Sequence, residues 1–328
     1  ITAVFIIGYT MLAGLMSLAY ADIVTGILIT VVIIIACIVY WIKTGGWSGV
    51  EASYAAMGDR PNHMQLWGVF SMKEIINYLL PVFLLVLGDA NQYQRIFASK
   101  SAKGARSAVT TMIFAALAIE LLIIFCAFLA SSLVPDPENG KYILIFAAKE
   151  FLPLPLGCLF MITVIGIIIS TANSFLLVPA TTFIRDVYVN FINPNVSSKK
   201  VLILSRLMIL VFGTIGFLVT RMFADTTGFF DKALFAFTIY GASITPSVVA
   251  AIIWPKATKA GSVSSILVGV IIALVWNQRP FKEALENIDA LSPLHGLDAV
   301  LPAIFMSVLC LVVVSLITQP VKENEIKK

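Results

Sequence analysis

Hydroxyl and amide side chains share one face of an apolar stretch that runs from about residue 154 to 178. A helix turns by about 100° per residue, which gathers the small and polar residues into a narrow stripe. At this stripe the adjacent hydroxyls of Ser170 and Thr171 suit a dehydrated sodium ion, because hard cations prefer several oxygen ligands. Small hydroxylated residues also form packing seams between membrane helices, so spacing alone favours packing and leaves ion binding open. The stripe comprises Thr163, Gly166, Ser170, Asn173, Ser174 and Thr181.

A second polar group follows an apolar run that ends at residue 87. The chain reads Gly-Asp-Ala-Asn-Gln-Tyr-Gln-Arg from residue 88 to 95, which places Asp89 and Asn91 near a membrane boundary. Glycine, proline and polar side chains within one spanning segment are typical of a discontinuous helix, whose broken ends serve as binding sites. An ordinary helix end, from which Arg95 and Lys100 reach toward the interface, is the alternative.

Two further carboxylates lie within or near apolar segments. Glu120 falls in the middle of the stretch 107–133, and Glu74 falls near the start of the stretch 67–89, beside Lys73. An acid inside the hydrocarbon is costly and is therefore a functional candidate by default. Because Glu74 can instead pair with Lys73 at the interface, we rank Glu120 above it.

A polar face also runs along the stretch 230–254. Thr238, Gly241, Ala242 and Thr245 follow one another there, just before Pro246. Small residues of this kind favour a close approach to another backbone. The alternative is that they line a cavity.

Residue types that support catalysis or transition-metal binding are sparse. The two histidines, His63 and His295, fall in loops without a neighbouring nucleophile or metal ligand. Each cysteine lies inside an apolar run without a CxxC pair, which favours small core residues over metal ligands or disulfides. We therefore do not expect an enzyme, and we do not expect a nucleic-acid partner. The cysteines are Cys37, Cys126, Cys158 and Cys310.

These residues belong to a chain whose composition suits the membrane interior. Of its 328 residues, 59% are hydrophobic and 12% are charged, and the mean hydropathy is +0.98, whereas a soluble domain carries roughly 25% charged residues. A spanning helix needs about 20 apolar residues, and such runs recur along the whole chain. We predict an all-α membrane protein with about nine transmembrane helices. The segments are 1–19, 22–41, 67–89, 107–133, 154–178, 201–219, 230–254, 262–277 and 298–318.

The charge distribution predicts how the chain is oriented. If the connections near 92–106 and 185–206 share one side with the tail, that side holds thirteen Lys and Arg residues against eight on the other. The positive-inside rule then predicts a multi-pass plasma-membrane protein with a cytoplasmic C-terminus. We expect one transmembrane domain over residues 1–318 and a short cytoplasmic tail over residues 319–328. Because the chain opens at Ile1 within an apolar run, we expect a fragment that lacks its start.

Three stretches together resemble the sodium:solute symporter family, which contains sodium-coupled sugar, proline, pantothenate and choline carriers. Residues 169–188 resemble its hallmark helix, with a Ser-Thr pair followed by a small residue, a polar residue and Ser. Residues 9–26 are similar to its Tyr-Thr-x-x-Gly-Gly segment ending in an Asp. Residues 91–108 resemble its Gln-Arg plus Ala/Ser-Lys-Ser stretch. With matching helix spacing, the resemblance covers essentially the whole chain.

The resemblance implies a five-plus-five inverted-repeat transporter fold with discontinuous helices. It implies that sodium is bound by the hydroxyls of Ser170 and Thr171 and by the backbone carbonyl of Ile167. Asn173 stands where many members have Asp, which weakens a claim for a second ion or for proton coupling. Thr25 and Ala13 also depart from the family pattern, since they replace a common Gln and the first Gly of the pair.

The same resemblance implies that the first three core helices are absent, and with them half of the sodium shell and much of the substrate pocket. The substrate positions that match on residues 82–87 are apolar, which disfavours a sugar. Asp89, in contrast, could face a cationic amine.

The activity that the resemblance implies is sodium-coupled import of a small organic solute by alternating access, within the lipid bilayer, by a monomer or a homo-oligomer. Proton coupling on the same fold, with Glu120 titrating, is one alternative. A transporter-like membrane sensor is another, which the short tail disfavours. The candidates for the solute path are Asp89, Asn91, Glu120, Thr238 and Asn173.

Overall fold

The computed structural model describes residues 2–13, 15–58, 64–65, 70–134, 142–223, 228–278, 281 and 296–319. Within these ranges every regular element is a helix. Eight helices are long and apolar enough to cross a membrane, and the apolar helix α1 (Thr2–Leu12) is shorter. The all-α membrane prediction is therefore confirmed. The predictions for His63, His295 and nearly all of the tail fall outside the described residues.

The described chain divides into two compact units, each assembled from separate stretches of sequence. The first unit comprises residues 1–69 and 94–222, and the second comprises residues 70–93 and 223–328. The single transmembrane domain over residues 1–318 stays a prediction. The first unit contains α1, α2 (Leu15–Thr44), α3 (Gly46–Ala56), α6 (Ala102–Leu133), α7 (Ile143–Phe151), α8 (Leu154–Thr182), the π-helix η3 (Phe183–Ile192) and α9 (Ser198–Phe223).

The first predicted boundary was wrong. The sequence suggested segments 1–19 and 22–41, whereas α1 ends at Leu12 and α2 runs from Leu15 to Thr44. Asp22, the first residue of the second predicted segment, therefore lies inside a spanning helix rather than at its end. Asp22 is tolerated there because it has side-chain partners, Arg95 and Ser170.

Two short helices fall in segments that the sequence suggested were loops. Gly45 and Gly46, with φ of 79° and 76°, turn the chain out of α2 and into α3. This left-handed backbone suits glycine because it has no Cβ. The Tyr54 hydroxyl of α3 then donates to the Phe128 carbonyl of α6 at 3.0 Å. Neither α3 nor α7 is long enough to span a membrane, which is why hydropathy did not reveal them.

The core of the first unit lies where α2 packs against α6 and α8. Its buried residues come from all three helices, and α3 and α7 close it from the side. Apolar packing of this kind holds α8, with its polar stripe, against α2. Members of this core include Val32, Ala36, Tyr40, Val50, Leu129, Ala147 and Phe160.

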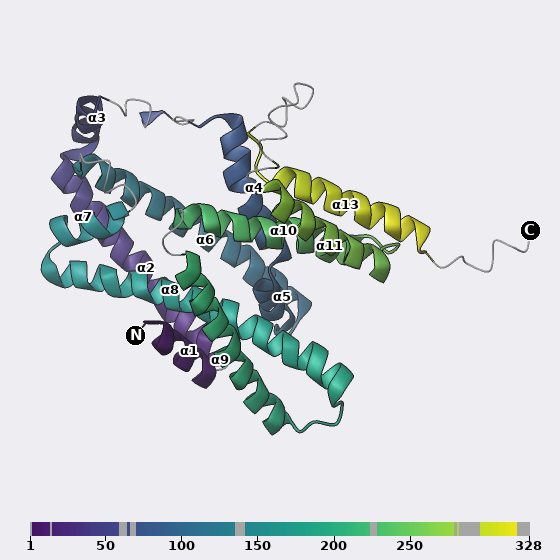
Figure 1. Ribbon diagram of the computed structural model, residues 1–328. Helices are drawn as coiled ribbons and strands as arrows, with labels where there is room; N and C mark the ends of the chain where they lie inside the picture. The colour runs from purple at the N-terminus through teal and green to yellow at the C-terminus, as the bar shows by residue number, and fades with distance from the viewer. Residues whose placement is uncertain are drawn as a thin grey trace, which may run out of the picture. The chain divides into compact units, whose positions relative to one another are not determined.

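The second unit contains α4 (Met72–Gly88), α10 (Phe229–Ile253), α11 (Lys259–Trp276) and α13 (Val300–Ile317). The short helix α5 (Ala90–Phe97) carries the chain into the first unit. α4 begins with a capping box, in which the Ser71 hydroxyl accepts from the Glu74 amide and the Glu74 carboxylate accepts from Ser71. α11 and α13 lie side by side (Figure 1), and the Ser265 and Ser307 hydroxyls are 2.8 Å apart between them.

Candidate functional site

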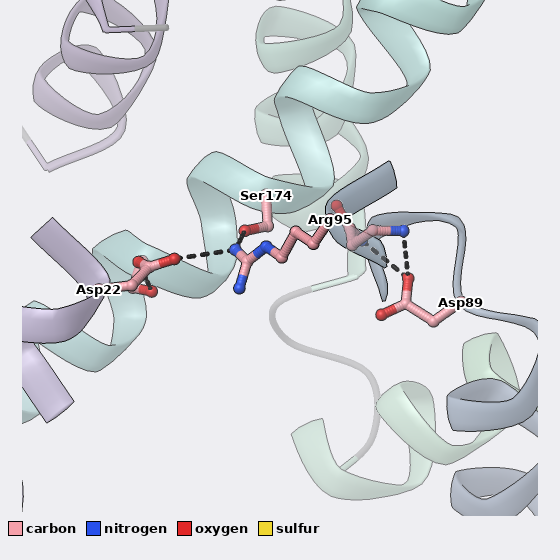
Figure 2. Close-up of polar contacts among 6 residues, drawn as sticks. Asp22, Asp89, Arg95 and Ser174 are labelled. Carbon is pink, nitrogen blue, oxygen red and sulfur yellow. Dashed lines mark hydrogen bonds and ion pairs between the residues drawn. The ribbon is translucent and has the colours of Figure 1, made fainter. Parts of the chain in front are cut away.

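The helix that was predicted to be discontinuous is broken at Asp89. α4 ends at Gly88, Asp89 adopts an extended conformation with ψ of 110°, and α5 begins at Ala90. The break is held locally, because one Asp89 carboxylate oxygen accepts from the amide and the side-chain nitrogen of Asn91, both at 2.9 Å. Figure 2 shows the Asp89 carboxylate with these two hydrogen bonds. The structure therefore brings the two candidates Asp89 and Asn91 into direct contact.

A tyrosine of α10 bridges the two sides of the break. The Tyr240 hydroxyl donates to the Gly88 carbonyl at 3.1 Å and accepts from the Ala90 amide at 3.3 Å. These are backbone groups that a continuous helix would pair within itself, and Tyr240 supplies their partner instead. Nothing in the amino-acid sequence indicated this role, since one tyrosine in a spanning helix is ordinary.

The polar face of α10 both approaches another helix closely and lines a cavity, which were the two alternatives considered from the sequence. A Cβ added to Gly241 would lie 2.8 Å from the Leu84 Cβ, so α4 and α10 approach closely at this point. The Thr245 hydroxyl donates to the Leu84 carbonyl at 2.6 Å. The favoured interpretation, close backbone approach, therefore describes Gly241 and Thr245. Thr238, two turns before Thr245, lines a cavity instead.

The hydroxyl stripe of α8 faces α2 at Asp22. The Ser170 hydroxyl donates to one Asp22 carboxylate oxygen. Arg95 of α5 donates from one guanidinium nitrogen to the other Asp22 oxygen at 2.8 Å and to the Ser174 hydroxyl at 3.0 Å. Figure 2 shows the Arg95 side chain extended between Asp22 and Ser174. Both charged side chains keep some exposure, 42% for Arg95 and 19% for Asp22.

Asn173 links the stripe to α1. Its side chain is 2% exposed, and its side-chain oxygen accepts from the Thr10 hydroxyl. Beside it, residues of α1, α2 and α8 enclose a cavity of about 220 Å³. Three residues with side-chain oxygens, Asp22, Ser170 and Asn173, line it together with Phe5, Tyr9, Ala21, Thr25, Gly166 and Ile169. Hard cations prefer ligands of this kind.

Three candidates lie outside this group of contacts. Thr171 is exposed, and its hydroxyl forms no hydrogen bond to a described residue. Ile167 is half-buried one helical turn before Thr171. Glu120 is exposed in the middle of α6 and has no described polar partner.

Asp22 is the residue that sequence reasoning missed. It appeared only as the end of a family motif, because the predicted boundary placed it at the very start of the segment 22–41. The rule that an intramembrane acid is a functional candidate would have selected it had α2 been predicted to start at Leu15. The Arg95 contact had no sequence signal, since 73 positions separate it from Asp22.

Other metal chemistry finds no support in the part of the chain that the structure describes. No group of three or more His, Cys, Asp or Glu side chains there is placed to hold a metal ion. The four cysteines are free thiols. Any cation at α8 would therefore rely on hydroxyl, amide and backbone oxygens with Asp22.

These features together define a multi-pass helical membrane protein with a discontinuous helix and a polar site between packed helices. A family model described as the sodium:solute symporter family matches residues 1–269, and the chain belongs to this family. The family consists of transporters rather than enzymes, as the sequence predicted.

Similar proteins support this assignment. The osmoregulated proline transporter OpuE of Bacillus subtilis is 24% identical over 326 residues, which cover 97% of this chain and 63% of the relative. A sodium/proline symporter of Staphylococcus aureus is 25% identical over 327 residues, which cover 97% of this chain and 62% of the relative. The chain thus spans less than two thirds of the length of these relatives.

A solved structure shows the same fold. It is a substrate-bound, outward-open Na⁺-coupled sialic acid symporter, with a TM-score of 0.71 and 18% sequence identity. The match covers 98% of this chain and 66% of the solved chain. The predicted transporter fold is therefore confirmed.

Proposed function

We propose that this chain is the larger part of a sodium-coupled symporter that imports a small organic solute across the plasma membrane by alternating access. The observation that carries the proposal is the contact of Ser170 with Asp22 at a cavity of about 220 Å³, in a chain that belongs to the symporter family. A half-buried carboxylate beside hydroxyl oxygens favours a cation by direct attraction.

The proposed sodium ligands are the hydroxyls of Ser170 and Thr171 and the backbone carbonyl of Ile167. Ser170 donates its only hydroxyl hydrogen to Asp22, so its lone pairs stay available to a cation. Thr171 has no described hydrogen-bond partner, so a sodium ion would not have to displace one. Sodium that crosses a membrane potential of 100 mV releases about 2.3 kcal/mol per charge, which can drive solute accumulation.

The proposed solute path includes Asp89, Asn91, Thr238, Asn173 and Glu120. The relatives named above are proline transporters, so we propose a small proline-like solute. Tyr240 anchors the break beside Asp89, which would let the two half-helices keep their relative geometry while solute binds.

Uptake by the full-length protein in proteoliposomes tests the proposal. We expect uptake to require an inward sodium gradient, and Ser170→Ala and Thr171→Ala each to raise the sodium concentration for half-maximal uptake about tenfold, since each removes one oxygen ligand. Thr220→Ala is the matched control, because that hydroxyl bonds only to the Gly216 carbonyl of its own helix at 2.8 Å.

Uptake that ignores both sodium and these two hydroxyls would make the stripe a packing seam. The proton-coupled alternative then predicts uptake in sodium-free buffer that depends on pH and is lost in Glu120→Gln. A protein that binds solute without moving it would support the sensor alternative.

A further inference from the structure

A second polar cavity lies within the second unit, where α4, α10 and α13 begin and α11 ends. Its volume is about 370 Å³, which falls in the range of small-molecule sites, roughly 300–1,000 Å³. All of its described lining residues belong to this unit. They are Glu74, Asn77, Tyr78, Asp231, Lys232, Leu234, Phe235, Thr238, Asn277, Asp298 and Ala299.

The mouth of this cavity is acidic. Three carboxylates, those of Glu74, Asp231 and Asp298, line it against one lysine, Lys232. All three acids are exposed. Ser71 engages the Glu74 carboxylate, whereas the carboxylates of Asp231 and Asp298 accept no hydrogen bond from a described residue. Two carboxylates at one opening, neither bonded to a described residue, favour a cationic ligand.

The interior of the cavity is lined by the side chain of Thr238. Thr238 is 4% exposed, and its hydroxyl forms no hydrogen bond with any residue in the described ranges. Thr238 follows Asp231 by seven residues along α10, which places it about 10 Å deeper than the mouth. Because Thr238 lines the cavity, a ligand there can form a hydrogen bond with this hydroxyl.

The other buried polar residue of the lining, Asn77, is already hydrogen-bonded. Asn77 is 9% exposed; its side-chain nitrogen donates to the Gly296 carbonyl at 3.1 Å, and its oxygen accepts from the Asp298 amide at 3.2 Å. Asn77 thereby fixes the start of α13 against α4 and holds Asp298 at the mouth. Thr238, in contrast, has no hydrogen-bond partner among the described residues.

Two aromatic side chains, Tyr78 and Phe235, also line the cavity. The Tyr78 ring is packed between Phe70 and Phe230, each with a centroid distance of 5.8 Å, so its position is fixed. Aromatic rings together with carboxylates are what recognises an alkylammonium group, because the ring face attracts a cation and its alkyl groups gain contact area.

We infer that this cavity binds the ammonium group of a small organic cation or zwitterion, with Asp231 and Asp298 at the mouth, the rings of Tyr78 and Phe235 along the wall and the Thr238 hydroxyl at the base. The inference goes beyond the proposed sodium-coupled transport, because binding here involves neither Ser170 nor Thr171. Thr238 is also a proposed member of the solute path, and for this residue the inference names the chemical class of the ligand, a small organic cation or zwitterion with an ammonium group.

Direct binding to the full-length protein in nanodiscs tests this inference, with tetramethylammonium as the probe and saturation-transfer NMR as the readout. Ionic strength is held constant with potassium chloride, and sodium is left out. We expect saturable binding of tetramethylammonium and none of tert-butanol, an uncharged probe of similar size. The double variant Asp231→Asn/Asp298→Asn should weaken binding at least about tenfold.

Control variants separate this site from others. Glu51→Gln removes an exposed acid of α3 outside the cavity and should bind the probe like the wild type. Ser170→Ala should also bind it normally, even if sodium coupling is lost, so failure of the proposed function would leave this result intact. Phe235→Leu, which keeps an apolar side chain, should weaken binding even if the double variant fails to fold.

Three results would overturn the inference. These are equal binding of the charged and uncharged probes, no binding of tetramethylammonium, and undiminished binding to the folded double variant.

Discussion

At the scale of single residues, the pair formed by Asp22 and Arg95 sets the charge beside the candidate sodium ligands. A carboxylate within a spanning helix needs partners, and Asp22 has two, Arg95 and Ser170. Its charge is therefore shared between a guanidinium and a hydroxyl that we propose as a sodium ligand. How strongly sodium binds at Ser170 should depend on how much of this charge Arg95 compensates.

Two substitutions with opposite expected effects test this dependence. Arg95→Gln leaves Asp22 uncompensated, so we expect the sodium concentration for half-maximal binding to fall about three- to tenfold. Asp22→Asn removes the charge and should raise that concentration by at least as much. Sodium binding to the full-length protein, measured by its protection against thermal unfolding, gives both values.

The double variant Arg95→Gln/Asp22→Asn decides whether the two residues act on sodium through each other. Without Asp22, loss of Arg95 should have little effect, so the double variant should resemble Asp22→Asn alone. If Arg95→Gln instead raises the sodium requirement as much as Asp22→Asn does, the pair holds the helices together and does not tune the ion.

The sequence identified part of this site through helical spacing. Ser170 and Asn173 fall on one face of α8, and the structure places both on the wall of one cavity. Asp22 and Arg95 were not connected, because their contact depends on tertiary packing between positions far apart in the chain. Spacing within one helix carries no information on such contacts.

At the scale of helices, the break at Asp89 was predictable and the contacts that hold it were not. Glycine followed by polar residues at the end of an apolar run predicted the discontinuity. The partners of the broken ends come from α10, about 150 positions later, with Tyr240 bonded to Gly88 and Ala90. The short helices α3 and α7 were missed because hydropathy responds to segments of spanning length.

The close approach of α10 to α4 gives a prediction about stability. Gly241→Ala places a Cβ 2.8 Å from the Leu84 Cβ and 3.0 Å from the Leu85 nitrogen, so one helix must shift. We expect a loss of about 1–3 kcal/mol in the free energy of unfolding, which is typical of overpacking. Thermal unfolding in detergent should show a lower midpoint.

Gly216→Ala is the matched control for that substitution. It lies within α9, and no described atom lies within 4 Å of the added Cβ. Both substitutions gain the same helix propensity, about 1 kcal/mol, so their difference isolates the clash. Equal midpoints for the two variants would mean that α4 and α10 pack less closely than the structure shows.

At the scale of the whole molecule, composition predicted that the chain lies in a membrane and approximately how many helices it has. Composition did not predict which helices pack together. α4 joins α10, α11 and α13 in one unit although the five described helices of residues 102–223 intervene in sequence. Apolar runs of similar composition do not indicate which helices pack against one another. Pairing depends on local fits, such as Gly269 against Ser243, where an added Cβ would lie 2.8 Å from the Ser243 Cα.

The orientation of the molecule follows from charge and gives the last prediction. Lys100, Lys103 and Arg106 follow α5, and each basic residue near an anionic leaflet contributes about 1 kcal/mol to the cytoplasmic location of its loop. Single cysteines at Ala98 and Ala257 should therefore react with an impermeant maleimide only after cells are permeabilised. A cysteine at exposed Ala56 of α3 should react on intact cells. The background is Cys158→Ser, which removes the one exposed native thiol.

The labelling result also decides which solution the acidic cavity faces. Asp231, Asn277 and Asp298 lie at helix ends on the predicted exterior side, so the expected pattern opens this cavity to the outside, where an imported solute arrives first. Labelling of Ala98 on intact cells would reverse the orientation. The cavity would then open to the cytoplasm, and an ammonium ligand bound there would be leaving the protein or regulating it from within.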